Sequence, residues 1–256
     1  MMKAWLYGIF VQFQMDIRSR SLFITCYLVP LLFFLMMGSV FTSIMPESKD
    51  TLIASMTIMG VSMGAFIGLP PALVEIYGSP IQKTYLANDI PVYYGLLTLF
   101  MSSFLHLLVM SSLILCLAPL FFDATIPTHL GIYYLHLILL IMTSLSVGAI
   151  LGLFVKTQAK LTMLSQLVFL PSLILSGIMF PSSLLPSLLE NLGKLFPATW
   201  GYRMLIDNKI GPYYLFILLV IFLFSLLICW GCLKKKRCYF LFQNDIITRG
   251  DDDEIR

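Results

Sequence analysis

Charged residues are scarce in this chain. It has 256 residues, of which only 11% are charged and 59% are hydrophobic. A soluble domain needs about 25% charged residues to cover its surface, so the composition excludes a protein that faces water on all sides. The length suffices for about six membrane spans of roughly 20 residues each with short connections. The composition therefore predicts an all-α integral membrane protein with no separate catalytic domain.

The motifs of nucleotide and metal chemistry are also missing. There is no Gly-x4-Gly-Lys-Ser/Thr loop to hold nucleotide phosphates, and no His-Glu-x-x-His. His106, His129 and His136 are not grouped with carboxylates at ligand spacing, and Cys229-x-x-Cys232 lacks a second cysteine pair. We therefore predict no catalytic, cofactor-binding or metal-ligating residue in this chain.

The apolar runs predict six spans, whose middles contain no aspartate, glutamate, lysine or arginine. This absence argues against a proton-coupled pump or a voltage sensor. A secondary transporter or channel stays open as an alternative, although it would normally place an ionisable residue at the midplane. Buried histidines in spans 3 and 4 are each expected to make one interhelical hydrogen bond. The predicted spans are 22–44, 52–76, 92–119, 131–155, 161–180 and 212–233.

Positive charge predicts the orientation of the spans. With six spans, 12 of the 16 lysines and arginines fall on the side that holds both termini. The positive-inside rule makes that side cytoplasmic, so both termini are expected there. Residues 234–237 form a basic cluster after the last span, and residues 238–256 are predicted to be a solvated cytoplasmic tail with an acidic end.

The segment before the first span is not a cleavable signal peptide, because polar residues interrupt it. Leu6, Phe10, Phe13 and Ile17 fall on one face of a helix over residues 3–20. Such a pattern predicts an interfacial helix that lies on the membrane surface.

Small residues recur in the second span. Gly60, Gly64 and Gly68 are spaced by four residues, which places them on one helix face suited to close packing in membranes. The same segment reads Gly-x-Ser-x-Gly around Ser62, which leaves open an intramembrane serine hydrolase that uses Ser62 with His106 or His136. Helix packing is the favoured interpretation, because the hydrolase motif requires a strand–turn–helix elbow.

Residues 171–203 contain a stretch that does not cross the membrane. Residues 184–196 are apolar but too short to span, and prolines bracket them. Glu190 and Lys194 are spaced to pair on a polar flank. The pattern predicts a short helix or re-entrant hairpin at the outer interface, where protein or water covers the irregular backbone.

This segment resembles the signature of ABC-2 type permeases, the membrane subunits of ABC exporters. The family pattern is a fifth span that ends in Ser-Gly and Phe-Pro, an extracellular helical hairpin, then Pro-x-Thr and a downstream arginine. The matching residues are Ser176, Gly177, Phe180, Pro181, Pro186, Pro197, Thr199 and Arg203. The resemblance extends to six spans, both ends inside and an N-terminal interfacial helix, so residues 1–237 are interpreted as a single ABC-2 type transmembrane domain.

The resemblance also implies an ATPase-contacting loop between spans 2 and 3. The residues that match the family's order there, together with one neighbouring tyrosine, are Glu75, Gly78, Lys83, Tyr85, Leu86 and Pro91. The loop is less charged than in typical members, and Pro80 departs from their pattern.

The function implied by the resemblance is export driven by ATP. A separate ABC ATPase subunit would bind ATP and Mg²⁺, and a second permease copy or a related permease would complete the pathway. We expect the protein to lie in the cell membrane, in contact with lipid, and to bind no nucleic acid. The apolar spans favour an amphiphilic cargo such as a drug or antibiotic, a lipid, a lipid-linked polymer or a peptide.

Overall fold

A computed structural model describes residues 2–78, 84–85, 88, 90–179, 185–207 and 212–254, with only the backbone described at 2–4, 21, 46 and 237–254. Within these residues the chain is 88% helical and contains no strand. Six helices are long and apolar enough to cross a membrane, which confirms the predicted six-span, all-α fold. The six spans are Ile24–Ile44, Leu52–Gly78, Tyr93–Phe122, Leu130–Phe154, Gln158–Leu175 and Pro212–Lys236.

Spans 1 and 2 are each built from more than one helical segment. Span 1 and span 2 each contain one turn of π-helix, at η1 and η3 respectively. In chain order the elements are α1 (Met2–Arg18), α2 (Arg20–Phe23), η1 (Ile24–Leu28), α3 (Val29–Ile44), the 3-10 helix η2 (Pro46–Asp50), α4 (Leu52–Met63), η3 (Gly64–Gly68), α5 (Leu69–Gly78), α7 (Tyr93–Phe122), α8 (Leu130–Phe154), α9 (Gln158–Leu175), α10 (Ser187–Gly193), α11 (Pro197–Asp207) and α12 (Pro212–Glu254).

The C-terminal ends of α7 and α9 differ from the predicted ones. α7 continues past Pro119 to Phe122, because a proline in the last turn removes only one backbone hydrogen bond, and the helix ends at Asp123 with φ 51°. α9 ends at Leu175 rather than 180.

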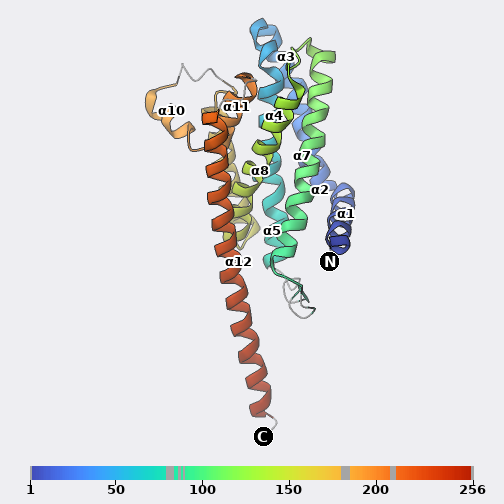
Figure 1. The fold of residues 1–256 in the computed structure, drawn as a ribbon, viewed down its shortest axis with the longest axis vertical. Coiled ribbons are helices and arrows are strands. Elements are labelled where there is room, and N and C mark those ends of the chain that lie inside the picture. Colours follow the sequence, from blue (N-terminus) through green and yellow to red (C-terminus); the bar gives the residue numbers. More distant parts are fainter. Residues whose placement is uncertain are drawn as a thin grey trace.

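The last helix is longer than the span it contains. Span 6 was predicted at 212–233 and is found at Pro212–Lys236, and α12 continues through the predicted tail to Glu254. No proline follows Pro212, so no residue after the first turn lacks the N–H that the helix needs. The C-terminal part of α12 projects beyond the end of the bundle (Figure 1).

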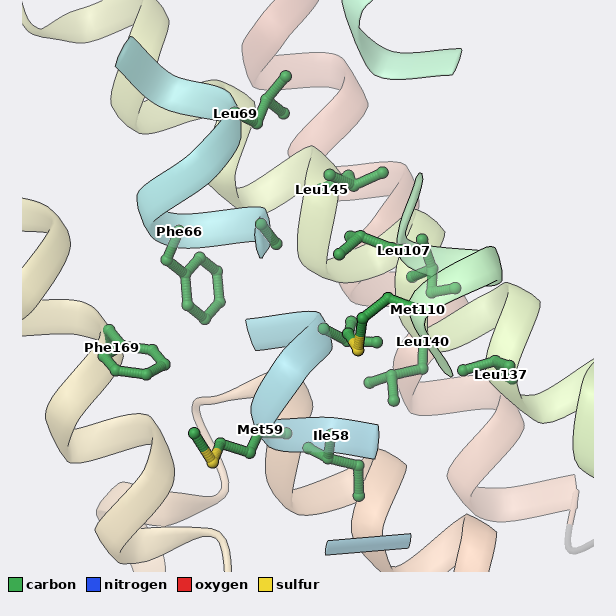
Figure 2. Close-up of a cluster of buried hydrophobic side chains, with 14 of the residues drawn as sticks. Ile58, Met59, Phe66, Leu69, Leu107, Met110, Leu137, Leu140, Leu145 and Phe169 are labelled. Atoms are coloured by element: carbon green, nitrogen blue, oxygen red, sulfur yellow. The ribbon is translucent and has the colours of Figure 1, made fainter. Parts of the chain in front are cut away.

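Span 2 occupies the centre of the bundle. Its most apolar window is 89% buried, whereas those of spans 1, 3, 5 and 6 are between 17% and 39% buried. Figure 2 shows its side chains meeting those of α7, α8 and α9. The residues in contact there include Ile58, Met59, Phe66, Leu107, Met110, Leu140 and Phe169. The spans with less burial keep apolar faces outward, as a lipid-exposed bundle requires.

The bundle has two ends, which are called the proximal end and the distal end. The proximal end holds α1, the start of α7 and residues 155–157, and α12 projects from it. The distal end holds η2, residues 123–129, α10 and α11 (Figure 1). At the distal end the Thr125 hydroxyl donates to the Asp50 carboxylate over 2.6 Å, and Lys49 lies 3.5 Å from Asp123, which joins the two connections there.

Candidate functional site

The distal hairpin begins where α9 ends. Ser176 is buried and its hydroxyl donates to the Leu173 carbonyl over 2.9 Å. Gly177 has φ 91°, a left-handed conformation that costs a glycine nothing and strains any other residue. The Ser-Gly pair thus terminates α9 and turns the chain towards α10. Phe180 and Pro181 lie outside the described residues.

Buried hydrogen bonds hold α10 and α11 together. The Thr199 hydroxyl donates to the Gly193 carbonyl over 2.5 Å, and the Trp200 indole N–H donates to the Lys194 carbonyl over 2.8 Å. Pro197 opens α11 and is buried there, a position where its missing N–H costs nothing. The end of α10 is therefore capped by side chains of α11.

Glu190 joins the same two helices on the surface. Its carboxylate lies 3.4 Å from the Lys194 ammonium and 3.5 Å from the Arg203 guanidinium. The predicted i,i+4 pair of Glu190 and Lys194 is thereby confirmed. The guanidinium of Arg203 also lies 5.7 Å from the centre of the Trp200 ring, a cation–π distance. Because these charges are partly exposed, they fix geometry more than they add stability.

At the proximal end, Tyr77 joins three spans. Its hydroxyl donates to the Val92 carbonyl over 2.7 Å and accepts from the Leu96 N–H over 3.0 Å, which clamps the end of α5 to the start of α7. The ammonium of Lys236 on α12 lies 5.2 Å from the centre of its ring. The segment between α5 and α7 therefore leaves and re-enters the bundle at a fixed point, and sequence reasoning did not single out Tyr77.

The predicted ATPase-contacting residues flank this clamp. Glu75 and Gly78 are exposed on the last turns of α5, whereas Lys83 and Leu86 lie outside the described residues. Tyr85 is half-buried, and its ring lies against Gly95, where an added Cβ would meet it at 3.1 Å. Burial, with a smaller contribution from Tyr94, raises the pKa of the Tyr85 hydroxyl above its ordinary value.

An aromatic row connects this loop to α1. The Tyr94 ring lies 6.3 Å from Tyr85 and 4.9 Å from Trp5, measured between ring centres. Trp5 also stacks on Tyr93 at 5.9 Å. Gly8 leaves room for this arrangement, because a Cβ there would overlap the Tyr94 hydroxyl. Trp5, Tyr94 and Tyr85 thus place the first helix, the start of α7 and the loop in one continuous contact.

The three glycines of span 2 face neighbouring spans 1 and 3. Pro30 and Met110 lie against Gly60, and Leu107 lies against Gly64. A Cβ at Gly68 would lie 3.2 Å from the sulfur of Cys26. Larger side chains at these positions would push the spans apart.

The hydrolase alternative needs Ser62 beside a histidine. Ser62 is buried, and its hydroxyl has no hydrogen-bond partner among the described residues. His106 instead contacts the Tyr27 hydroxyl, and His136 lies near the backbone of Met204. The hydrogen bond between nucleophile and base that this chemistry requires is thus not formed.

A buried polar group lies where α1 meets α7, and the sequence did not predict it. Asp16 is only 5% exposed; it accepts hydrogen bonds from Ser102 and from Gln12, the latter over 2.8 Å. His106 makes the interhelical hydrogen bond that was expected of it, with Tyr27 at 2.7 Å. The signal for Asp16 was an acidic residue in a helix otherwise suited to an apolar surface.

Six helices that are long and apolar enough to cross a membrane define a multi-pass membrane protein. The family model described as "ABC-2 type transporter" matches residues 9–210, most of the chain. The chain therefore belongs to the ABC-2 type transporter family and is the membrane subunit of an ABC transporter, which confirms the resemblance seen in residues 171–203. No curated protein matched the chain significantly.

Proposed function

We propose that this chain is the permease subunit of an ATP-driven exporter, that two permease chains form its pathway, and that a separate ATPase subunit supplies the energy. Membership of the ABC-2 family is the observation that supports this proposal most strongly. In this arrangement the proximal end faces the cytoplasm and the ATPase binds there, with the protein in the cell membrane.

The contacts at the proximal end support a route for the mechanical step. A push on Tyr85 would reach Tyr94, and then Trp5 on α1, through ring contacts. The Tyr77 clamp would pass the same displacement to α5 and α7. Because packed side chains shift together rather than deform, one movement of the loop would displace α1 and spans 2 and 3 together.

The cargo proposed for this pathway is amphiphilic: a drug or antibiotic, a lipid, a lipid-linked polymer or a peptide. The support is the composition of the spans, whose exposed faces carry large apolar side chains. A cargo that moves along such surfaces keeps its apolar part out of water.

Purification of the tagged full chain in a mild detergent tests the proposal. We expect an ATPase with a phosphate-binding loop to co-purify, together with a second permease chain. In the reconstituted complex, Tyr85→Ala should lower ATP turnover on the order of tenfold, because the coupling free energy between two sites is typically about 1–3 kcal/mol. Tyr213→Ala is the matched control, since that tyrosine is 64% exposed at the distal end.

Two results would contradict the proposal. One is recovery of the chain without any ATPase under conditions that preserve known transporter complexes. The other is an equal effect of the Tyr85→Ala and Tyr213→Ala substitutions on ATP turnover, which would place coupling elsewhere.

A further inference from the structure

Asp16 is the only aspartate, glutamate, lysine or arginine that is buried among the described side chains. Burial of a carboxylate is costly unless hydrogen bonds or an opposite charge compensate it. Ser102 on α7 and Gln12 on α1 both donate to it. These neutral donors satisfy part of the carboxylate and leave its charge without a counter-ion among the described residues.

His106 is the neighbour that can supply the missing charge. Its Nε2 atom lies 4.0 Å from the Asp16 carboxylate and has no hydrogen-bond partner, although the side chain is only 2% exposed. Its Nδ1 atom is 2.7 Å from the Tyr27 hydroxyl. The Phe13 ring of α1 stacks on the imidazole at 4.4 Å and limits its rotation. The imidazole thus has one nitrogen engaged and the other aimed at a carboxylate.

We propose that Asp16 and His106 form a binding site for one proton, and that its occupancy tightens the attachment of α1 to the bundle. With both ring nitrogens protonated, Nε2–H donates to the Asp16 carboxylate and Nδ1–H donates to the Tyr27 hydroxyl. The approach across the 4.0 Å gap converts a contact into a charged hydrogen bond. Without that proton, Asp16 keeps only its neutral donors.

Among the side chains that the structure describes, two other titratable groups face the pair, and both come from η1. They are the Cys26 thiol, which lies close enough to interact with Asp16, and the Tyr27 hydroxyl. Free thiols and phenols titrate at about 8.5 and about 10, above the histidine range near 6.5. An imidazole is the one side chain of this cluster whose free form changes charge between about pH 5 and about pH 8.

The proton site adjoins the irregular turns of spans 1 and 2. Cys26 and Tyr27 belong to the π-helix η1, and Cys26 lies against Gly68, the last residue of the π-helix η3. π-helical turns inside α-helices are frequently found at functional sites. Proton binding would thus act beside the irregular turns of two spans, whether or not the export role holds.

Hydrogen exchange of the α1 amides, followed by mass spectrometry on the full chain in mild detergent, tests this site. Labelling at about pH 5.5 and about pH 8, on either side of the histidine range, is scaled to the intrinsic exchange rate at each pH. We expect wild-type α1 to exchange on the order of tenfold more slowly at the lower pH, as a gained charged hydrogen bond implies. This contrast should vanish in His106→Gln and persist in His129→Gln, since His129 is exposed at the distal end.

The Ser102→Ala variant distinguishes an effect of the bound proton from a general weakening of the contact between α1 and the bundle. That variant removes a donor to Asp16 and keeps the titrating pair, so α1 should exchange faster at both pH values and retain the pH contrast. The proposal is overturned if wild type shows no contrast, if His106→Gln keeps it, or if Ser102→Ala loses it.

Discussion

At the scale of single residues, the space around a glycine decides what that glycine does. Gly148 in α8 lies directly against the Ala65 carbonyl of η3, so a Cβ there would overlap backbone. Gly231 in α12 faces outward, and a Cβ added to it would meet no atom within 4 Å. Glycine thus allows a close helix contact in α8, whereas the glycine in α12 makes no such contact among the described residues.

We expect Gly148→Ala to lower the free energy of unfolding by about 1–3 kcal/mol, because the backbone of η3 must move to admit the methyl group. Gly231→Ala is the control; it should leave stability unchanged or raise it by up to about 1 kcal/mol through helix propensity. Thermal unfolding midpoints in detergent measure both, and equal midpoints would rule out the packing argument.

At the scale of elements, the distal hairpin is held by buried hydrogen bonds rather than by its ion pairs. Thr199 is 3% exposed where it donates to Gly193, whereas Glu190 is about one-third exposed beside Lys194 and Arg203. Water screens an exposed pair and leaves its net contribution small. A buried acceptor that loses its donor has no water to replace it.

Thr199→Val should therefore lower the free energy of unfolding by about 1–3 kcal/mol. Glu190→Gln should change it by less than about 1 kcal/mol. Thr162→Val is a matched control, because that hydroxyl is exposed and donates within its own helix. Thermal unfolding midpoints rank the loss of stability in the three variants. A larger loss in Glu190→Gln than in Thr199→Val would contradict the prediction.

At the scale of the whole molecule, alternation of the spans gathers the loops at two ends with different charge. The proximal end carries Lys156 and the lysines at the end of span 6, whereas the distal end pairs its Lys49 with Asp123. The positive-inside rule then orients the whole bundle. Both termini should face the cytoplasm, and η2 should face outward.

Cysteine labelling in right-side-out vesicles checks this orientation. Glu47→Cys, exposed at the distal end, should react with a membrane-impermeant maleimide in sealed vesicles. Thr157→Cys, exposed at the proximal end, should react only after the membrane is permeabilised. The unmodified chain, with its five native cysteines, sets the background. The opposite pattern of labelling would invert the topology and the proposed site of the ATPase.

The amino-acid sequence by itself determined the number of spans and the family signature. Apolar runs of about 20 residues indicate spanning helices, because a helix satisfies every backbone group within its own segment and a barrel strand needs only about 10 residues. The Ser176-Gly177 pair and Pro197 were also readable, since each acts locally: one ends α9 and the other begins α11. At α12 the basic cluster marked the end of the span but not the end of the helix, because charged residues are compatible with a helix outside the membrane.

Only the tertiary structure decided which distant side chains meet. Asp16 and Ser102 are 86 residues apart in the chain, and Tyr27 and His106 are 79 apart, yet they form one buried cluster. Periodicity assigns a residue to a helix face but not to a partner helix, so neither this cluster nor the Tyr77 clamp followed from the sequence. Contacts between spans depend on how whole helices pack, and the packing of six helices is a property of the folded chain.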